Sequence, residues 1–105
     1  MTHNQLETLL PFFQALSDAT RLRLVGLLAR EPATVEQLAA NIGLSASTVS
    51  HHLKRLGDLG LVAARVEGHY HVYALQTERL TEIADLIQAE TEKAIGGSHE
   101  RDTDV

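Results

Sequence analysis

One stretch of this sequence decides its fold: Leu44-Ser45-Ala46-Ser47-Thr48-Val49-Ser50-His51-His52-Leu53-Lys54-Arg55-Leu56. Val49, Leu53 and Leu56 follow the i, i+4, i+7 spacing of an amphipathic helix with one apolar face. The opposite face collects hydroxyl, imidazole and cationic side chains, namely Ser47, Thr48, Ser50, His51, Lys54 and Arg55. Because hydroxyls and imidazoles can contact base edges in a DNA major groove and cations can contact phosphates, we predict a DNA-reading helix. The alternative is an ordinary solvated helix face.

The residues before this helix predict a second, short helix and a tight connection. Thr34 is followed three residues later by Gln37, which is the capping-box pattern that opens a helix. Gly43 is placed to end that helix, and Ser45 is placed to cap the next one, which should end near Gly60. Two short helices joined in this way form a helix-turn-helix.

Two further helices are predicted on the N-terminal side. Residues 5–16 are apolar at helical spacing, and Pro11 either kinks this helix or marks the first turn of its second half. Ser17-Asp18 offers an N-cap for the second helix, which the pair Glu31-Pro32 ends.

On the C-terminal side the hydrophobic pattern changes. Residues 61–75 are β-branched and aromatic runs around Gly68, which predicts a β-hairpin. Thr77 is placed to cap a last helix whose apolar stripe ends at Ile95. The fold class expected from this order is mainly α with a small β-hairpin, a winged helix-turn-helix.

Composition indicates a single domain and excludes several kinds of site. The chain has 105 residues and no cysteine, which excludes disulfides, thiolate metal sites and cysteine nucleophiles. We assign residues 1–97 to one DNA-binding and dimerisation domain and expect the acidic residues 98–105 to form a disordered tail. No apolar run approaches the ~20 residues that cross a bilayer, and no signal peptide is evident, so we expect a cytoplasmic protein without a membrane partner.

The net charge of −5 is unusual for a DNA-binding protein, but the acids are unevenly distributed. Residues 80–105 carry most of the excess, whereas residues 45–79 have more bases than acids and include His51, His52, His69 and His71. No glycine-rich phosphate loop is present, and Asp58 lies two turns from His51 on another face of the predicted helix. We therefore expect no enzymatic activity.

Three motifs, in this order and spacing, resemble the ArsR/SmtB family of bacterial repressors. The first is Phe13-Gln14-Ala15-Leu16-Ser17-Asp18-Ala19-Thr20-Arg21-Leu22-Arg23-Leu24. The second is the stretch quoted at the outset, which is similar to the family's recognition helix. The third is Gly60-Leu61-Val62, followed by Arg65, Gly68 and Tyr73-Ala74-Leu75, which looks like its wing.

The resemblance implies a homodimer that places two recognition helices in successive major grooves of a palindromic DNA operator, with repression that ends when a ligand binds. The base-reading positions it implies are Ser45, Ser47, Thr48, Ser50 and His51. Lys54, Arg55, Arg65 and His69 are expected at the backbone or wing contacts. The dimer interface it implies joins the first and last helices, through Leu6, Leu9, Leu10, Phe13, Leu80, Ile83, Ile87 and Ile95. Some members have Gln where this chain has Ala46. Ala cannot make the bidentate contact to adenine that Gln can make, so the resemblance implies no base preference at this position.

The metal-sensing sites of the family are not matched here. The helix before the recognition helix has no thiol, the last helix has no histidine, and Arg79 occupies a position where a ligand is expected. We therefore expect no metal or other cofactor. Weaker candidates are a terminal site made by His3, His99 and Glu100 with nearby carboxylates, and the wing pair His69 and His71, placed on one face of a strand.

Alternatives to the DNA-binding repressor are a metal-responsive repressor using the terminal histidines and carboxylates, and a winged helix that serves protein–protein interaction. The role of His52 stays open between a DNA contact and packing within the protein.

Overall fold

The computed structural model describes residues 2–95, with the side chains of the last helix described up to residue 89. In chain order the elements are α1 (His3–Leu16), α2 (Ala19–Arg30), β1 (Ala33–Thr34), α3 (Val35–Ile42), α4 (Ala46–Asp58), β2 (Val62–Glu67), β3 (Tyr70–Leu75) and α5 (Thr77–Ile95). The predicted helices, hairpin and winged helix-turn-helix are therefore confirmed.

The helix-turn-helix forms as the local signals indicate. The Thr34 hydroxyl accepts from the Gln37 backbone N–H at 3.1 Å, and the Gln37 side chain accepts from the Thr34 backbone N–H at 2.9 Å. Gly43 adopts the left-handed conformation, with φ of 83°, and its N–H donates to the Ala39 carbonyl at 2.8 Å. Ser45 then caps α4.

The core is built around α4. Val49, Leu53 and Leu56 are completely buried, as their spacing predicts. They pack in one cluster with other buried apolar residues, among them Leu24, Leu28, Leu38, Leu61 and Val62. Because this face of α4 is fixed in the core, the polar face of the same helix must lie at the surface.

The sheet has three strands rather than the predicted two. The short strand β1 pairs antiparallel with β3, matching Ala33 with Tyr73, which gives the order β1-β3-β2. Glu67 pairs with Tyr70, so Gly68 and His69 form a two-residue turn. Gly68 has φ of 64° and no non-glycine residue in 2–95 has positive φ, as in a type II′ turn. The expectation that His69 shares a strand face with His71 is therefore wrong.

Two helix boundaries also differ from expectation. Helix α1 begins at His3 because Thr2 and Gln5 form a second capping box, and it continues through Pro11 to Leu16. Thr77 is the first residue of α5 rather than its cap, and its carbonyl accepts from the Thr81 hydroxyl at 2.9 Å.

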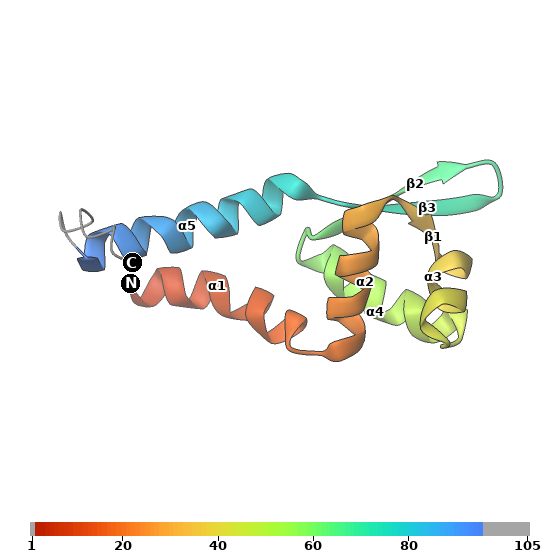
Figure 1. The fold of residues 1–105 in the computed structure, drawn as a ribbon, viewed down its shortest axis with the longest axis horizontal. Helices are drawn as coiled ribbons and strands as arrows, with labels where there is room; N and C mark the ends of the chain where they lie inside the picture. The colour runs from red at the N-terminus through yellow and green to blue at the C-terminus, as the bar shows by residue number, and fades with distance from the viewer. Residues whose placement is uncertain (1, 96–105) are drawn as a thin grey trace.

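The molecule is elongated, 53 × 28 × 23 Å. Figure 1 shows α1 and α5 extending in the same direction, away from the part of the molecule formed by α2, α3, α4 and the sheet. We call these two helices the arms. Within residues 2–95, no helix is both long enough and apolar enough to span a membrane.

Candidate nucleic-acid interface

The exposed face of α4 brings five of the predicted DNA-contacting residues together. A shallow depression of about 520 Å³ is lined by Ser47, Thr48, Ser50, His51 and Lys54. All five side chains are exposed, and the apolar stripe of the same helix is completely buried behind them. The arrangement presents hydrogen-bonding groups at the start of the helix and a cation further along it.

Ser45 has a different local role from its predicted neighbours. Its hydroxyl accepts from the Thr48 backbone N–H at 3.1 Å and donates to Thr48 Oγ1 at 2.9 Å. The first contact is that of a helix N-cap, and the second uses the single proton of the Ser45 hydroxyl. The structure therefore gives Ser45 a capping function at the edge of the depression.

The predicted phosphate-contacting cations are exposed, and two of them lie close to acids. Lys54 Nζ lies 3.6 Å from Asp58 Oδ1, and the side chain of Arg65 donates to that of Glu67, two residues further along β2. Such exposed ion pairs contribute little to stability, so a phosphate can replace the acid as a partner. Arg55 is exposed in the last turn of α4, where the helix dipole favours a cation.

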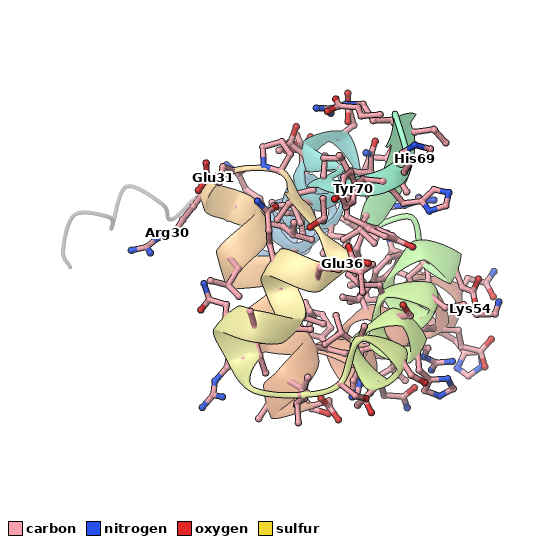
Figure 2. The ribbon with its side chains drawn as sticks, turned by 90° about the vertical axis from the view of Figure 1, so that its right-hand side faces the viewer. Arg30, Glu31, Glu36, Lys54, His69 and Tyr70 are labelled. Carbon is pink, nitrogen blue, oxygen red and sulfur yellow. The ribbon has the colours of Figure 1, made fainter. Side chains whose placement is uncertain are left out.

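The wing and α4 face the same side of the protein. In Figure 2, Lys54 of α4 and His69 of the wing turn both lie along one side, whereas Arg30 and Glu31 lie on the opposite side. His69 and His71 are both exposed. The polar face of α4 and the tip of the hairpin thus lie on the same side of the protein.

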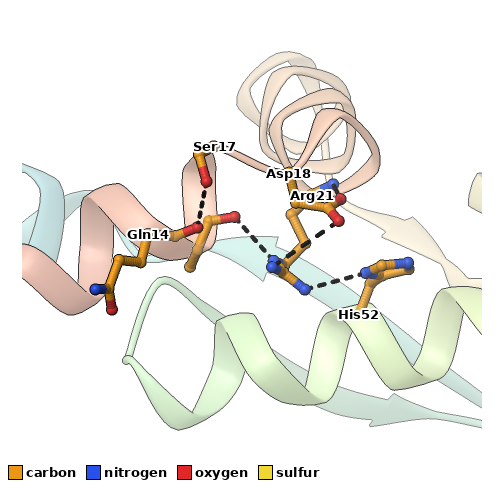
Figure 3. A network of polar contacts seen from close by, with 6 residues as sticks. Gln14, Ser17, Asp18, Arg21 and His52 are labelled. Carbon is orange, nitrogen blue, oxygen red and sulfur yellow. Dashed lines mark hydrogen bonds and ion pairs between the residues drawn. The ribbon is translucent and has the colours of Figure 1, made fainter.

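His52 points into the protein rather than toward this surface. Its side chain is half-buried, and Nδ1 lies 3.4 Å from Nη1 of Arg21 on α2, as Figure 3 shows. The structure therefore gives His52 a packing contact within the protein. Arg21 was not among the predicted site residues, although it lies within the first of the three quoted motifs and three residues after the N-cap Asp18.

Asp18 is held in its charged form by the same group of residues. The Arg21 backbone N–H donates to Asp18 Oδ1 at 3.0 Å, and this hydrogen bond lowers the pKa of the Asp18 carboxyl below its ordinary value. Burial acts in the opposite direction, and the charge of Arg21 lowers the pKa further.

The sites considered for a metal are not brought together. Within the described part of the chain, no three His, Asp or Glu side chains are grouped so that they could hold a metal ion. His3 lies 3.1 Å from Glu7 on the exposed side of α1, and His99 and Glu100 lie outside the described residues. Arg79 donates to Glu82 at 3.0 Å, and its guanidinium lies 5.8 Å from the centre of the Phe12 ring.

The predicted dimer residues fall into several groups. Four of them have exposed side chains on the arms: Leu6 (43% exposed), Leu10 (40%), Phe13 (51%) and Ile87 (37%). Leu9 is only 3% exposed, so its side chain is already covered within one chain. Leu80 and Ile83 are partly buried against the core, and the side chain of Ile95 lies outside the described region.

Comparison with known proteins relates this surface to a family. Residues 18–64, which span α2, the helix-turn-helix and the start of the wing, match the family model of bacterial regulatory proteins, arsR family. A transcriptional repressor SmtB homolog from Synechocystis is 38% identical over 92 residues, covering 84% of this chain and 70% of that protein. The regulator CmtR of Mycobacterium bovis is 41% identical over 76 residues, covering 71% of this chain and 64% of its own length.

A solved structure agrees in fold as well as in sequence. It is the homodimeric winged helix-turn-helix DNA-binding domain of a possible ArsR-family regulator from Mycobacterium bovis. It superimposes with a TM-score of 0.67 at 30% identity, covering 83% of this chain and 82% of that one. Sequence and fold agree, and the chain therefore belongs to the arsR family of bacterial regulatory proteins.

Proposed function

We propose that this chain is a sequence-specific transcriptional repressor that binds a palindromic double-stranded DNA operator as a homodimer. The observation that carries the proposal is the exposed depression on α4, where hydroxyls, an imidazole and an ammonium group face outward. B-DNA has a major groove about 12 Å wide, which admits one α-helix. Helix α4 is the element whose polar face is free to enter it.

The side chains of this surface divide by chemistry. Ser47, Thr48, Ser50 and His51 can donate to and accept from base edges, so we assign them to sequence reading. Lys54, Arg55 and Arg65 are assigned to phosphates, which fix the position of the protein without reading sequence. His69, at the tip of the wing, is assigned to the DNA backbone or minor groove beside the site read by α4.

We assign the apolar surface of the arms to a second copy of this chain. Leu6, Leu10 and Phe13 of α1 are exposed large apolar side chains, and Ile87 adds to them from α5. Apolar groups exposed together on elongated arms are typical of an oligomer interface. The homodimeric state of the Mycobacterium bovis relative supports this assignment. Leu80, Ile83 and Ile95 complete the proposed seam.

The proposed activity is binding rather than catalysis, and it takes place in the cytoplasm, where the bacterial chromosome lies. The similar proteins are transcriptional regulators, which supports a non-enzymatic role. We propose no resident metal or other cofactor.

The test of DNA reading compares two substitutions on α4. After the binding sites are mapped on the chromosome, affinity is measured for one such operator and for a scrambled duplex over a range of salt concentrations. Lys54→Gln should weaken both complexes and reduce the salt slope by about one. Ser50→Ala should mainly reduce the ratio of operator to scrambled affinity. Equal wild-type affinity for both duplexes would exclude sequence-specific binding and favour a protein-interaction role.

The test of the dimer uses sedimentation at micromolar concentration. Leu10→Glu combined with Phe13→Glu should convert the wild-type dimer into monomers. The matched control is Leu22→Glu, because Leu22 is 56% exposed on α2 but lies outside the arms. A wild-type monomer, or equal dissociation by the control, would contradict the assignment.

A further inference from the structure

Arg21 lies where three elements meet, at the junction drawn in Figure 3. Its Nε–H donates to the Ala15 carbonyl in the last turn of α1 at 2.8 Å. Its Nη1 lies 3.4 Å from His52 Nδ1 in the middle of α4, and its Nη2 lies 3.9 Å from Asp18 Oδ2 at the N-cap of α2. The Arg21 side chain is only 20% exposed. One guanidinium therefore connects the α1 arm, the start of α2 and the recognition helix.

The chemistry of this junction requires a planar, branched donor. A guanidinium has five N–H donors in a fixed fork, and each of its three nitrogens faces a different partner here. It also places a cation at the C-terminal end of α1, whose last turn contains no basic residue. A lysine ammonium is a compact point charge at the end of a flexible chain and does not reproduce this fixed fork.

The contact with His52 extends toward the DNA-facing surface. Because a guanidinium can only donate, Nδ1 of His52 accepts and the imidazole proton is on Nε2. The ring of His52 meets the ring of His51 edge-on, with centroids 6.4 Å apart and planes at 70°. His51 in turn lines the depression on α4. Arg21 on α2 is thus linked through the half-buried His52 to the polar face of α4.

The geometry of the arm makes this junction a sensitive point. Helix α1 has 14 residues and is therefore about 21 Å long, and it joins α2 through Ser17 and Asp18 alone. A rotation of about 10° at that connection moves the far end of α1 by about 4 Å, close to the ~3.4 Å spacing of successive base pairs. An angular change of this size is enough to shift one recognition helix by a base pair relative to its partner.

We propose that Arg21 is a positioning residue for DNA binding, which acts through His52 to fix the angle between the α1 arm and α4. This inference rests on the proposed function, because the angle matters only if a dimer formed through the arms places two copies of α4 on one operator. Arg21 itself stays away from the DNA. It sets the separation of the two recognition helices, and thereby the half-site spacing that the dimer accepts.

The experiment measures affinity for three duplexes: the full palindrome, a single half-site, and palindromes with one base pair added or removed between the half-sites. Arg21→Lys removes the fork but keeps the charge, and His52→Leu removes the acceptor. Each substitution should lower the affinity for the palindrome at least about tenfold, which is the effect expected from losing a hydrogen bond with a charged donor. The affinity for the half-site should change less than about twofold. Both should also reduce the preference for the native spacing.

Two variants serve as controls. His52→Asn keeps a side-chain acceptor and should restore wild-type binding to the palindrome. Arg23→Lys makes the same chemical change on the same helix, two residues away at an exposed position, and should have no effect. Thermal melts establish that each variant is folded, and His52→Leu keeps the test open if Arg21→Lys unfolds.

The outcomes separate this inference from the proposed function. If Arg21→Lys and His52→Leu bind the palindrome like wild type, or weaken palindrome and half-site equally, the positioning role is wrong. If the wild type itself shows no preference for a palindrome over a half-site, the proposed dimeric function fails instead.

Discussion

The hydroxyls of Ser45 and Thr48 lie 2.9 Å apart at the first turn of α4, and the Ser45 hydroxyl also accepts from the Thr48 backbone N–H. This pair connects the stability of the recognition helix with the orientation of one of its proposed base-reading groups. The N-cap thus holds Thr48 in place through both its backbone and its side chain.

Substitutions of Ser45 should therefore separate capping from DNA reading. Ser45→Ala should destabilise the protein by about 1 kcal/mol because the cap is lost, and should weaken operator binding with it. Ser45→Asn, which also caps helices well, should restore the free energy of unfolding and operator affinity together. Denaturant unfolding and operator titration measure the two effects. Stability restored without affinity would show that Ser45 itself contacts the DNA.

Two glycines should respond to alanine in opposite directions. A Cβ at Gly60 would lie 2.9 Å from Arg79 Nε, and Gly60 has φ of 77°, so Gly60→Ala should destabilise the protein by about 1–2 kcal/mol. Gly26 lies in α2, and a methyl group there would meet no other side chain within 4 Å, so Gly26→Ala should stabilise the helix by about 0.5–1 kcal/mol. Chemical denaturation measures both changes, and equal signs would contradict the geometry around Gly60.

Acid should weaken the α1–α2 junction. The pKa of Asp18 is lower in the folded chain than the ordinary value of 3.8, chiefly because the Arg21 backbone N–H donates to its carboxylate. A carboxyl whose pKa is lower in the folded chain stabilises the protein at pH values above its pKa in the unfolded chain. This stabilisation is lost as the pH falls through its pKa in the folded chain. Asp18→Asn keeps the cap but does not titrate. The difference in unfolding free energy between wild type and Asp18→Asn should therefore shrink below about pH 4; a constant difference would contradict this role.

Local signals predicted the centre of the fold well. Thr34 with Gln37, Gly43 and Ser45 each act within a few residues, so their hydrogen bonds are already implied by their order in the chain. The stripe of Val49, Leu53 and Leu56 is likewise a property of a single helix. These residues predict α3, the turn and α4, and therefore which side chains of α4 reach the surface.

Long-range pairing accounts for what the sequence did not reveal. Residues 33–34 are too short a segment to show strand alternation, and β1 forms only because β3 offers Tyr73 and Val72 as partners. Arg21 and His52 are 31 positions apart, and their contact depends on how α2 packs against α4. The inward direction of His52 follows from that packing, which a helix pattern alone does not specify.

Zinc, nickel and cobalt should leave a preformed complex with the operator intact at one ion per protomer. At the start of α5, the Arg79 guanidinium lies beside Glu82 and close to the Phe12 ring, and a fixed cation there opposes the binding of another. Ions held by His3, or by His99 and Glu100, would be bound weakly by few donors, and a ligand shifts an equilibrium only by its differential affinity for the two states. The measurement is a titration of each ion against a labelled operator complex, followed by a chelator. Release at stoichiometric ion that reverses with the chelator and disappears in His3→Ala or His99→Ala would establish a terminal sensor site and overturn this prediction.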